Sequence, residues 1–213
     1  MPVAREGLPF IALFVLVAGL VTGLAPTPYP GGVCWVLALW CIWFFRDPDR
    51  VSPQGPGLVV APADGKVIVI EEVAQAPLTG RPARKISIFM NVFSVHVNRL
   101  PESGTVRGLA YHPGRFFNAA LDKASLENER MAVHLATTDG RELVFVQVAG
   151  LIARRIVCRL KEGDRGERGQ RFGLIRFGSR VDCYLPLDAR VQVTLGDQTR
   201  AGESVLAQMG GGS

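Results

Sequence analysis

The chain opens with two apolar runs and then changes to short alternating segments. Residues 9–24 and 31–45 contain no charged side chain, and the proline-rich residues 25–30 separate them. Each run is shorter than the roughly 20 residues that a helix needs to cross a bilayer. We therefore expect residues 1–50 to form a helical hairpin that thins the bilayer or enters one leaflet and returns. Two buried core helices are the alternative, but such helices usually carry a polar stripe, which these runs lack.

From residue 58 onward, short apolar stretches alternate with polar residues and are broken by glycine. This pattern is typical of strands joined by turns, and Asp139-Gly140 suits a hairpin loop because these residue types tolerate positive φ. Helix is expected only at residues 117–125 and 151–153. The expected strands are residues 58–60, 66–70, 85–90, 104–108, 131–135, 143–148, 156–160, 172–177, 181–185 and 190–195.

Residues 51–213 are accordingly predicted to be a mainly β domain, antiparallel and barrel-like or sandwich-like, behind an N-terminal hydrophobic α-helical hairpin. Two turn-rich stretches, residues 61–66 and 198–203, resemble the hairpins of lipoyl-type barrels. Residues 161–170 are charged and glycine-rich, and a solvated hairpin tip is favoured there over a functional lid.

Charge indicates the partner of the apolar hairpin. The net charge is +5 and the pI is near 9.3, which suits either nucleic acid or anionic lipid. The hairpin favours lipid, and the absence of a zinc-finger spacing or an RNA-binding motif argues against nucleic acid. Arg5, Arg46 and Arg50 flank the hairpin. By the positive-inside rule both ends, and with them the β domain, face the cytoplasm at the cell membrane.

The cysteines predict no metal site. Cys34 and Cys41 lie in the second apolar run, Cys158 and Cys183 lie in the β domain, and no pair has CxxC spacing. We expect buried thiols in a reducing compartment, with neither zinc nor a disulfide framework.

The pair Gly178-Ser179 is the main candidate for chemistry. Glycine leaves its carbonyl unshielded, so the serine hydroxyl can attack it and form an ester. Elimination then leaves dehydroalanine, and hydrolysis converts this into a pyruvoyl group, a ketone that ordinary side chains do not supply. Because most Gly-Ser pairs are simply turns, the surroundings must decide. The second pair, Gly212-Ser213, ends the chain without a strand context and is expected to be a flexible tail.

A serine nucleophile needs a base and a group that orients the base. His96 lies in an apolar, strand-like run, whereas His112 precedes Pro113-Gly114 in a turn and suits either a supporting or a loop role. His134 alternates with apolar residues and is expected to be structural. Asp64 precedes a glycine, which by itself is typical of a turn.

Six sequence blocks, in this order, resemble the phosphatidylserine decarboxylase family, in particular its short form. They are residues 44–48, 61–66, 95–99, 113–116 with 128–130, 177–180, and 201–206. The resemblance implies a proenzyme that cuts itself between Gly178 and Ser179. The products are a β chain of residues 1–178 and an α chain of residues 179–213, held as a heterodimer that can assemble further. Ser179 becomes the covalent pyruvoyl cofactor.

The resemblance also implies the reaction. The pyruvoyl ketone forms a Schiff base with phosphatidylserine and takes up the electrons as carbon dioxide leaves, which yields phosphatidylethanolamine. Asp64, His96 and Ser179 form the implied catalytic set, with His96 as the base. A site tethered to the membrane lets the acyl chains stay in the bilayer while the headgroup enters.

One position departs from the family pattern. Longer members carry two histidines three residues apart, and here the second position is Arg99. Either His96 serves both cleavage and decarboxylation, or His112 or a water takes the second role. Arg99 is expected to bind the substrate phosphate or carboxylate, or else to be a surface cation; His112 is the other substrate-binding candidate.

Two other functions stay open from the sequence. A non-catalytic, membrane-anchored β module that binds anionic lipid would use residues 177–180 only as a glycine kink. A pyruvoyl enzyme for a soluble amino acid is the third interpretation, against which the apolar hairpin argues.

Overall fold

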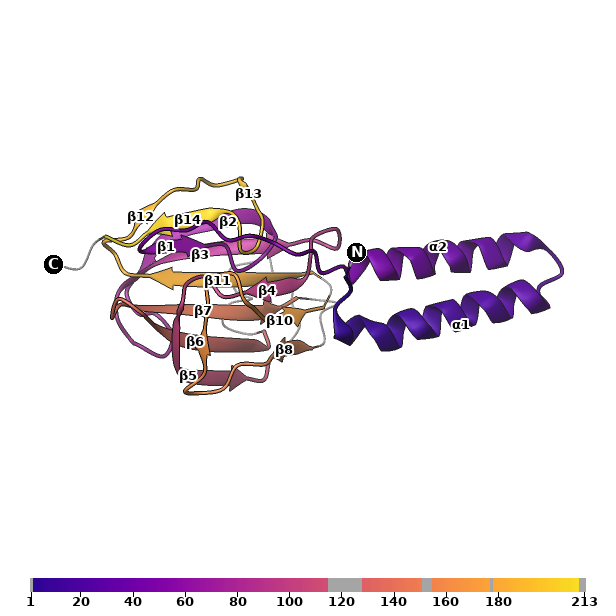
Figure 1. The fold of residues 1–213 in the computed structure, drawn as a ribbon, viewed down its shortest axis with the longest axis horizontal. Helices are drawn as coiled ribbons and strands as arrows, with labels where there is room; N and C mark the ends of the chain where they lie inside the picture. Colours follow the sequence, from indigo (N-terminus) through magenta and orange to yellow (C-terminus); the bar gives the residue numbers. More distant parts are fainter. Residues whose placement is uncertain (1, 115–127, 151–154, 177, 211–213) are drawn as a thin grey trace. The chain divides into compact units, whose positions relative to one another are not determined.

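A computed structural model describes residues 2–114, 128–150, 155–176 and 178–210. The chain forms two compact units, residues 1–49 and residues 50–213 (Figure 1). The helices expected at residues 117–125 and 151–153 and the tail Gly212-Ser213 lie outside the described residues.

The first unit is the predicted helical hairpin. A 3₁₀ turn, η1 (Arg5–Gly7), leads into α1 (Leu8–Leu24), and α2 (Pro28–Phe44) follows after three residues. Both helices carry proline in the first turn, where its missing N–H is tolerated. Because η1 extends α1, the helical stretch is 20 residues long, and by length and composition it can cross a membrane. The prediction that the first run is too short was therefore wrong; α2 is shorter.

The two helices approach closely through small residues. Gly31 lies against Thr22, and a Cβ on Gly31 would be 2.5 Å from Thr22 Oγ1. Ala18 and Ala38 are also buried within the hairpin. The other faces expose leucine, valine and tryptophan, and only 11% of the most apolar window is buried. Such exposure does not fit two core helices of a soluble domain.

The second unit is built from antiparallel strands in three open sheets, which confirms the mainly β prediction. The largest sheet has eight strands in the order β13-β2-β3-β11-β7-β6-β5-β9, and the others have the orders β1-β14-β12 and β4-β10-β8. Among the described strands, no sheet closes into a barrel. The strands are β1 (Leu58–Val60), β2 (Gly65–Val73), β3 (Ala83–Met90), β4 (Val97–Arg99), β5 (Gly104–His112), β6 (Arg130–Thr137), β7 (Glu142–Ala149), β8 (Ile156–Cys158), β9 (Arg165–Gly166), β10 (Arg171–Ile175), β11 (Ser179–Leu185), β12 (Arg190–Val191), β13 (Gln198–Thr199) and β14 (Val205–Gln208).

Each of the ten expected strand segments contains a strand, and the hairpin turn is confirmed. Gly140 has φ +82°, and the Thr137 N–H bonds the Arg141 carbonyl across the turn at 2.8 Å. The pattern missed β4, β9, β13 and β14, which have two to four residues each. Strands this short show too few alternations to be distinguished from loop.

The segment of residues 161–170 is more firmly held than a solvated tip. β9 pairs with the start of β5, and the Arg168 guanidinium donates to the carbonyls of Pro53 and Gly55 at 2.8 Å each. Arg168 also pairs with the buried Glu102 at 3.0 Å. Burial raises the pKa of the Glu102 carboxyl, and the hydrogen bonds of Ser103 and Arg168 oppose that rise.

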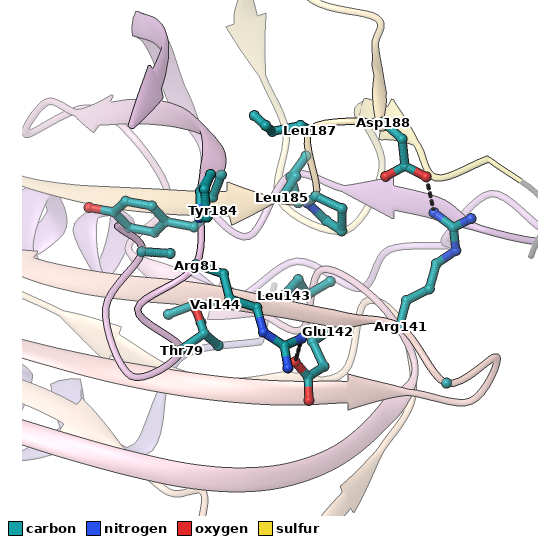
Figure 2. Close-up of a pocket in the computed structure, with 15 residues that line it drawn as sticks. Thr79, Arg81, Arg141, Glu142, Leu143, Val144, Tyr184, Leu185, Leu187 and Asp188 are labelled. Carbon is teal, nitrogen blue, oxygen red and sulfur yellow. Dashed lines mark hydrogen bonds and ion pairs between the residues drawn. The ribbon is translucent and has the colours of Figure 1, made fainter. Parts of the chain in front are cut away.

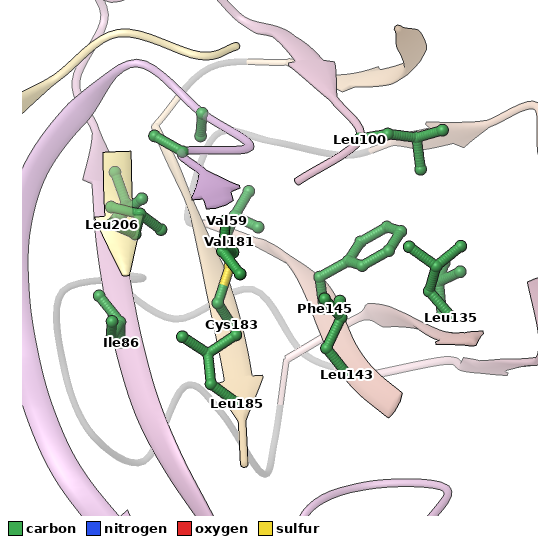
Figure 3. Close-up of a cluster of buried hydrophobic side chains, with 14 of the residues drawn as sticks. Val59, Ile86, Leu100, Leu135, Leu143, Phe145, Val181, Cys183, Leu185 and Leu206 are labelled. Carbon is green, nitrogen blue, oxygen red and sulfur yellow. The ribbon is translucent and has the colours of Figure 1, made fainter. Parts of the chain in front are cut away.

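β11 lies in the middle of the large sheet and all of its seven residues are buried. β3 pairs with one edge of β11 and β7 with the other. Val181, Cys183 and Leu185 lie in a row on one face, packed with Phe145, Val59 and Leu206 (Figure 3). This cluster joins the large sheet to β1 and β14 of a small sheet, so β11 lies at the centre of the hydrophobic core. Burial also raises the pKa of the Cys183 thiol.

The two turn-rich stretches near the ends of the domain lie side by side. β13 pairs with the start of β2, and the Thr199 hydroxyl lies 3.0 Å from the Ala63 carbonyl. The residues that flank Asp64 are therefore held by the C-terminal part of the chain.

Two glycines of β5 should respond oppositely to alanine. A Cβ on Gly104 would lie 2.3 Å from the Ala136 carbonyl oxygen, whereas a Cβ on Gly108 meets no described atom within 4 Å. We expect Gly104→Ala to cost about 1–3 kcal/mol of unfolding free energy and the control Gly108→Ala to be neutral or slightly stabilising. Denaturant midpoints of the full chain in detergent test this, and equal effects of the two variants would contradict it.

Candidate active site

Ser179 is the first residue of β11, and its side chain is completely buried. Its Cα is paired with Met90, the last residue of β3, and with Ala149, the last residue of β7. Gly178 precedes it with φ +57°, a left-handed conformation that favours glycine. The Gly178-Ser179 bond thus lies at a turn that enters the central strand.

Three buried side chains support the Ser179 hydroxyl. The hydroxyl donates to Met90 Sδ, with Oγ 3.3 Å from the sulfur. Asn98 Nδ2 reaches the same sulfur at 3.7 Å, and Gln147 Nε2 donates to Asn98 Oδ1 at 2.8 Å. All four side chains are fully buried.

His96 lies beside β10, the strand that precedes Ser179. Its imidazole is 2% exposed, and its backbone carbonyl accepts a hydrogen bond from the Ile175 N–H at 3.4 Å. β4 follows directly and pairs with β10, which ends four residues before Ser179. The structure therefore brings His96 and Ser179 to the same end of the domain.

Asp64 is held by Arg50, which was expected only to flank the apolar hairpin. Arg50 binds both carboxylate oxygens, with Nη2 2.9 Å from Oδ2. The Ala201 N–H donates to Oδ1 at 2.8 Å, and Arg50 also donates to the Ala201 carbonyl. The pair is mostly buried, with side-chain exposures of 8% and 15%. Buried carboxylates require such a partner, which is the physical reason why the block around Asp64 needs a nearby cation.

Arg99 is buried and is not a surface cation. Its side chain donates to the Gly169 carbonyl at 2.9 Å and is 5% exposed. With Arg50, Arg168 and Arg171 it lines a basic pocket of about 550 Å³.

His112 and His134 lie away from the Ser179 side chain. His112 ends β5, in a cross-strand row that runs through Arg130 and Val148 to Arg180. Three strand spacings separate the row's ends, which is about 14 Å and beyond hydrogen-bond reach. His134 lies within β6, with Nε2 3.7 Å from a Glu142 carboxylate oxygen, as expected for a structural residue.

Comparison with known proteins decides the family. The family model described as phosphatidylserine decarboxylase matches residues 37–207. A phosphatidylserine decarboxylase proenzyme of Magnetococcus marinus is 54% identical over 98% of this chain and 96% of the relative. Proenzymes of the same name are 52% identical in Paramagnetospirillum magneticum, over 98% of this chain and 87% of the relative, and 49% identical in Syntrophus aciditrophicus, over 96% of both.

The chain belongs to the phosphatidylserine decarboxylase family. Members are carboxy-lyases, so this chain is a decarboxylase. The structure also places another block of the family beside Ser179. Asn128 Nδ2 donates to the Ala149 carbonyl at 2.7 Å, and Ala149 pairs with Ser179.

Sequence reasoning missed four residues of this phosphatidylserine decarboxylase site, namely Arg50, Met90, Asn98 and Gln147. Gln147 offered a clue, because a glutamine in the apolar stretch of residues 143–148 must find a partner when buried. Asn98 lies two residues after His96 and offered the same clue. Met90 offered no such clue, because a methionine in an apolar strand is expected to be an ordinary core residue.

One pocket of this family member lies at the other end of β11 (Figure 2). It has a volume of about 920 Å³, and the ion pairs Arg81–Glu142 and Arg141–Asp188 border it. Ser179 is six residues away along the strand from Leu185, about 20 Å. A second pocket of about 740 Å³ contains Asp182, three residues from Ser179, together with His112, Lys85 and others. Asp182 points to the face of β11 opposite to Ser179, so this pocket does not lie beside the Ser179 side chain.

The residue after Ser179 belongs to a buried ion pair. Arg180 Nε lies 2.8 Å from Asp182 Oδ1, and the two side chains are 0% and 1% exposed. They point to the face of β11 opposite to Ser179 and the main core, since successive strand residues alternate. Among the residues described, no three His, Cys, Asp or Glu side chains gather closely enough to hold a metal ion.

Removing one partner of the buried pair should be costly. We expect Asp182→Asn, which leaves the Arg180 charge buried, to lower the unfolding free energy by about 3–5 kcal/mol. The control Glu142→Gln breaks the exposed Arg81 pair and should cost at most about 1 kcal/mol. Chemical denaturation of the full chain compares the two, and similar losses would show that the Arg180–Asp182 pair is not structurally important.

Proposed function

We propose that this chain cuts itself between Gly178 and Ser179 and then decarboxylates phosphatidylserine to phosphatidylethanolamine. The observation that carries the proposal is the buried Ser179 hydroxyl at the start of the central strand, directly after a left-handed glycine. The relatives' names support it, because each is a proenzyme.

The cleavage chemistry balances with one water. The Ser179 Oγ attacks the Gly178 carbonyl carbon while a base takes its proton, and the peptide C–N bond breaks to leave an ester and a free amine. Loss of the Ser179 α-proton then breaks the Cβ–O bond, which yields a Gly178 carboxylate and a dehydroalanine. Addition of water and loss of ammonia leave the pyruvoyl group at the new N-terminus.

We assign the base to His96 and the orienting acid to Asp64. The burial of His96 and the position of β4 beside β10 support the first assignment. For Asp64, the bidentate contact with Arg50 fixes the carboxylate plane. A third group that holds the base in one orientation is what nucleophilic catalysis by serine requires.

The residues around Ser179 fit a pyruvoyl group. After maturation the Ser179 Cβ is a methyl, and the Met90 thioether next to it accepts an apolar neighbour. When formed, the group supplies a ketone that condenses with an amine and accepts the electrons released with carbon dioxide. The buried strand end excludes water from that ketone.

The two chains are expected to stay together after the cut. The α chain of residues 179–213 contains β11, β12, β13 and β14, and three of these pair with strands of the β chain. β11 is paired along both edges with β chain strands. A heterodimer is therefore the expected mature form.

The pocket of about 740 Å³ is in the size range of small-molecule sites, but it lies on the face of β11 opposite to Ser179, so the headgroup is not assigned to it. His112, Arg130 and Lys85 line it with cationic or protonatable groups suited to a phosphate or carboxylate. Arg99 is better explained as a positioning residue, since its side chain already supports the Gly169 carbonyl.

We further propose a location at the cell membrane with the β domain in the cytoplasm. The exposed apolar faces of α1 and α2 support membrane association. Arg5 and Arg46 at the two ends of the hairpin support the orientation.

Intact mass spectrometry of the parent and of Ser179→Ala tests the proposal. We expect two fragments from the parent, the smaller with a blocked pyruvoyl N-terminus, and one uncut, inactive chain from the variant. Release of carbon dioxide from phosphatidylserine micelles, compared with free serine, identifies the substrate. A parent that stays uncut with membranes would contradict the proposal and favour the lipid-binding module, and a preference for free serine would favour the soluble amino-acid enzyme.

Replacement of the assigned base should slow maturation selectively. We expect His96→Ala to lower the cleavage rate by about 10²–10⁴-fold, the range for a lost general base. The matched control is His134→Ala, which removes a histidine of β6 and should cleave at the parent rate. Time courses on denaturing gels measure both, and parental cleavage by His96→Ala would exclude His96 as the base.

A further inference from the structure

Residue 179 must occupy its site in two chemical forms, and this inference rests on the proposed self-cleavage. Before the cut its side chain is a hydroxymethyl group, and afterwards the same carbon is a methyl. The side chain is completely buried, so the surrounding atoms must accept both forms without water. A strong hydrogen-bond acceptor would suit only the first form, because it would be left unpaired beside the methyl.

The neighbour of the Ser179 hydroxyl is a thioether. Met90 Sδ lies 3.3 Å from Ser179 Oγ, and Met90 is itself fully buried. Thioether sulfur is a weak acceptor and also packs well as an apolar atom. It therefore suits both the hydroxyl and the methyl.

The Met90 sulfur is held in place by two further buried side chains, Asn98 and Gln147. Asn98 Nδ2 approaches it at 3.7 Å, and Gln147 Nε2 fixes the Asn98 amide by donating to Oδ1 at 2.8 Å. β4 and β7 thus position a side chain of β3, a residue type that otherwise adopts many rotamers.

The weakness of the contact also serves the cleavage step. Sulfur of a thioether cannot take a proton at neutral pH, so the hydroxyl must leave Met90 before a base can activate it. A weak acceptor lets the hydroxyl go readily, whereas an amide oxygen at the same place would retain it. We propose that Met90 is a positioning residue that seats residue 179 in both its serine and its pyruvoyl form, with Asn98 and Gln147 as its support.

Two variants of Met90 separate this role from simple packing. Met90→Leu keeps the size and removes the acceptor, and we expect cleavage within about threefold of the parent. Met90→Gln keeps the length and adds a strong acceptor, and we expect cleavage to slow about tenfold or more. The control Met209→Gln buries an amide after β14 in the same core cluster, outside the Met90 network, and should cleave at the parent rate. Cleavage is followed by intact mass of the full chain in detergent.

A second readout uses Ser179→Ala, whose side chain is the methyl itself. In this uncut background we expect Met90→Leu to melt close to its parent and Met90→Gln to melt about 4–8 °C lower. Leucine and glutamine variants that slow cleavage equally, or a glutamine variant that cleaves at the parent rate, would overturn the proposal. A parent chain that never cleaves would instead refute the proposed function, so the two failures are distinguishable.

Discussion

The pairing of β11 along both edges is the constraint on which the rest of the β domain depends. β3 and β7 each hold at least six residues of this strand. One face of β11 supplies Val181, Cys183 and Leu185 to the main core. The other face supplies Arg180 and Asp182, whose charges are tolerated there because they neutralise each other. The position of Ser179 is therefore set by the same ladders that stabilise the domain, which gives the site the rigidity that the proposed attack on the Gly178 carbonyl requires.

The sequence predicted the long strands and the helical hairpin well, but it missed the short strands and the exact helix bounds. Apolar patterning revealed the long strands, since residues 143–146 are a continuous apolar run in β7 and residues 180–183 alternate in β11. It could not reveal β4, whose three residues position His96 and Asn98, since a strand of that length has no readable period. The bounds of α1 were also misjudged, because Arg5 and Gly7 are not apolar but continue the helix as a 3₁₀ turn.

The candidate site shows the same limit more sharply. Ser179, His96 and Asp64 were named from blocks that resemble a family, whereas the partners that hold each of them depend on tertiary structure. Arg50 lies 14 residues from Asp64 in the chain and still binds both of its carboxylate oxygens. Met90 and Ser179 are 89 residues apart. Spacing along a sequence carries no information about such pairs until the strand order is known.

The place of the α chain in the fold has a consequence for the order of events in the cell. Residues 179–213 contribute strands to two different sheets and interleave with the β chain in both. While the chain is intact, these strands pair with the other strands by loop closure within one molecule. The entropic cost of loop closure grows only slowly with loop length. After the proposed cut before Ser179, the same fold becomes an association of two polypeptides, and its recovery after unfolding depends on their concentration. The proposed cut would therefore follow folding of the intact chain. A mature molecule that unfolds cannot refold in a unimolecular reaction, because its two chains must first meet again.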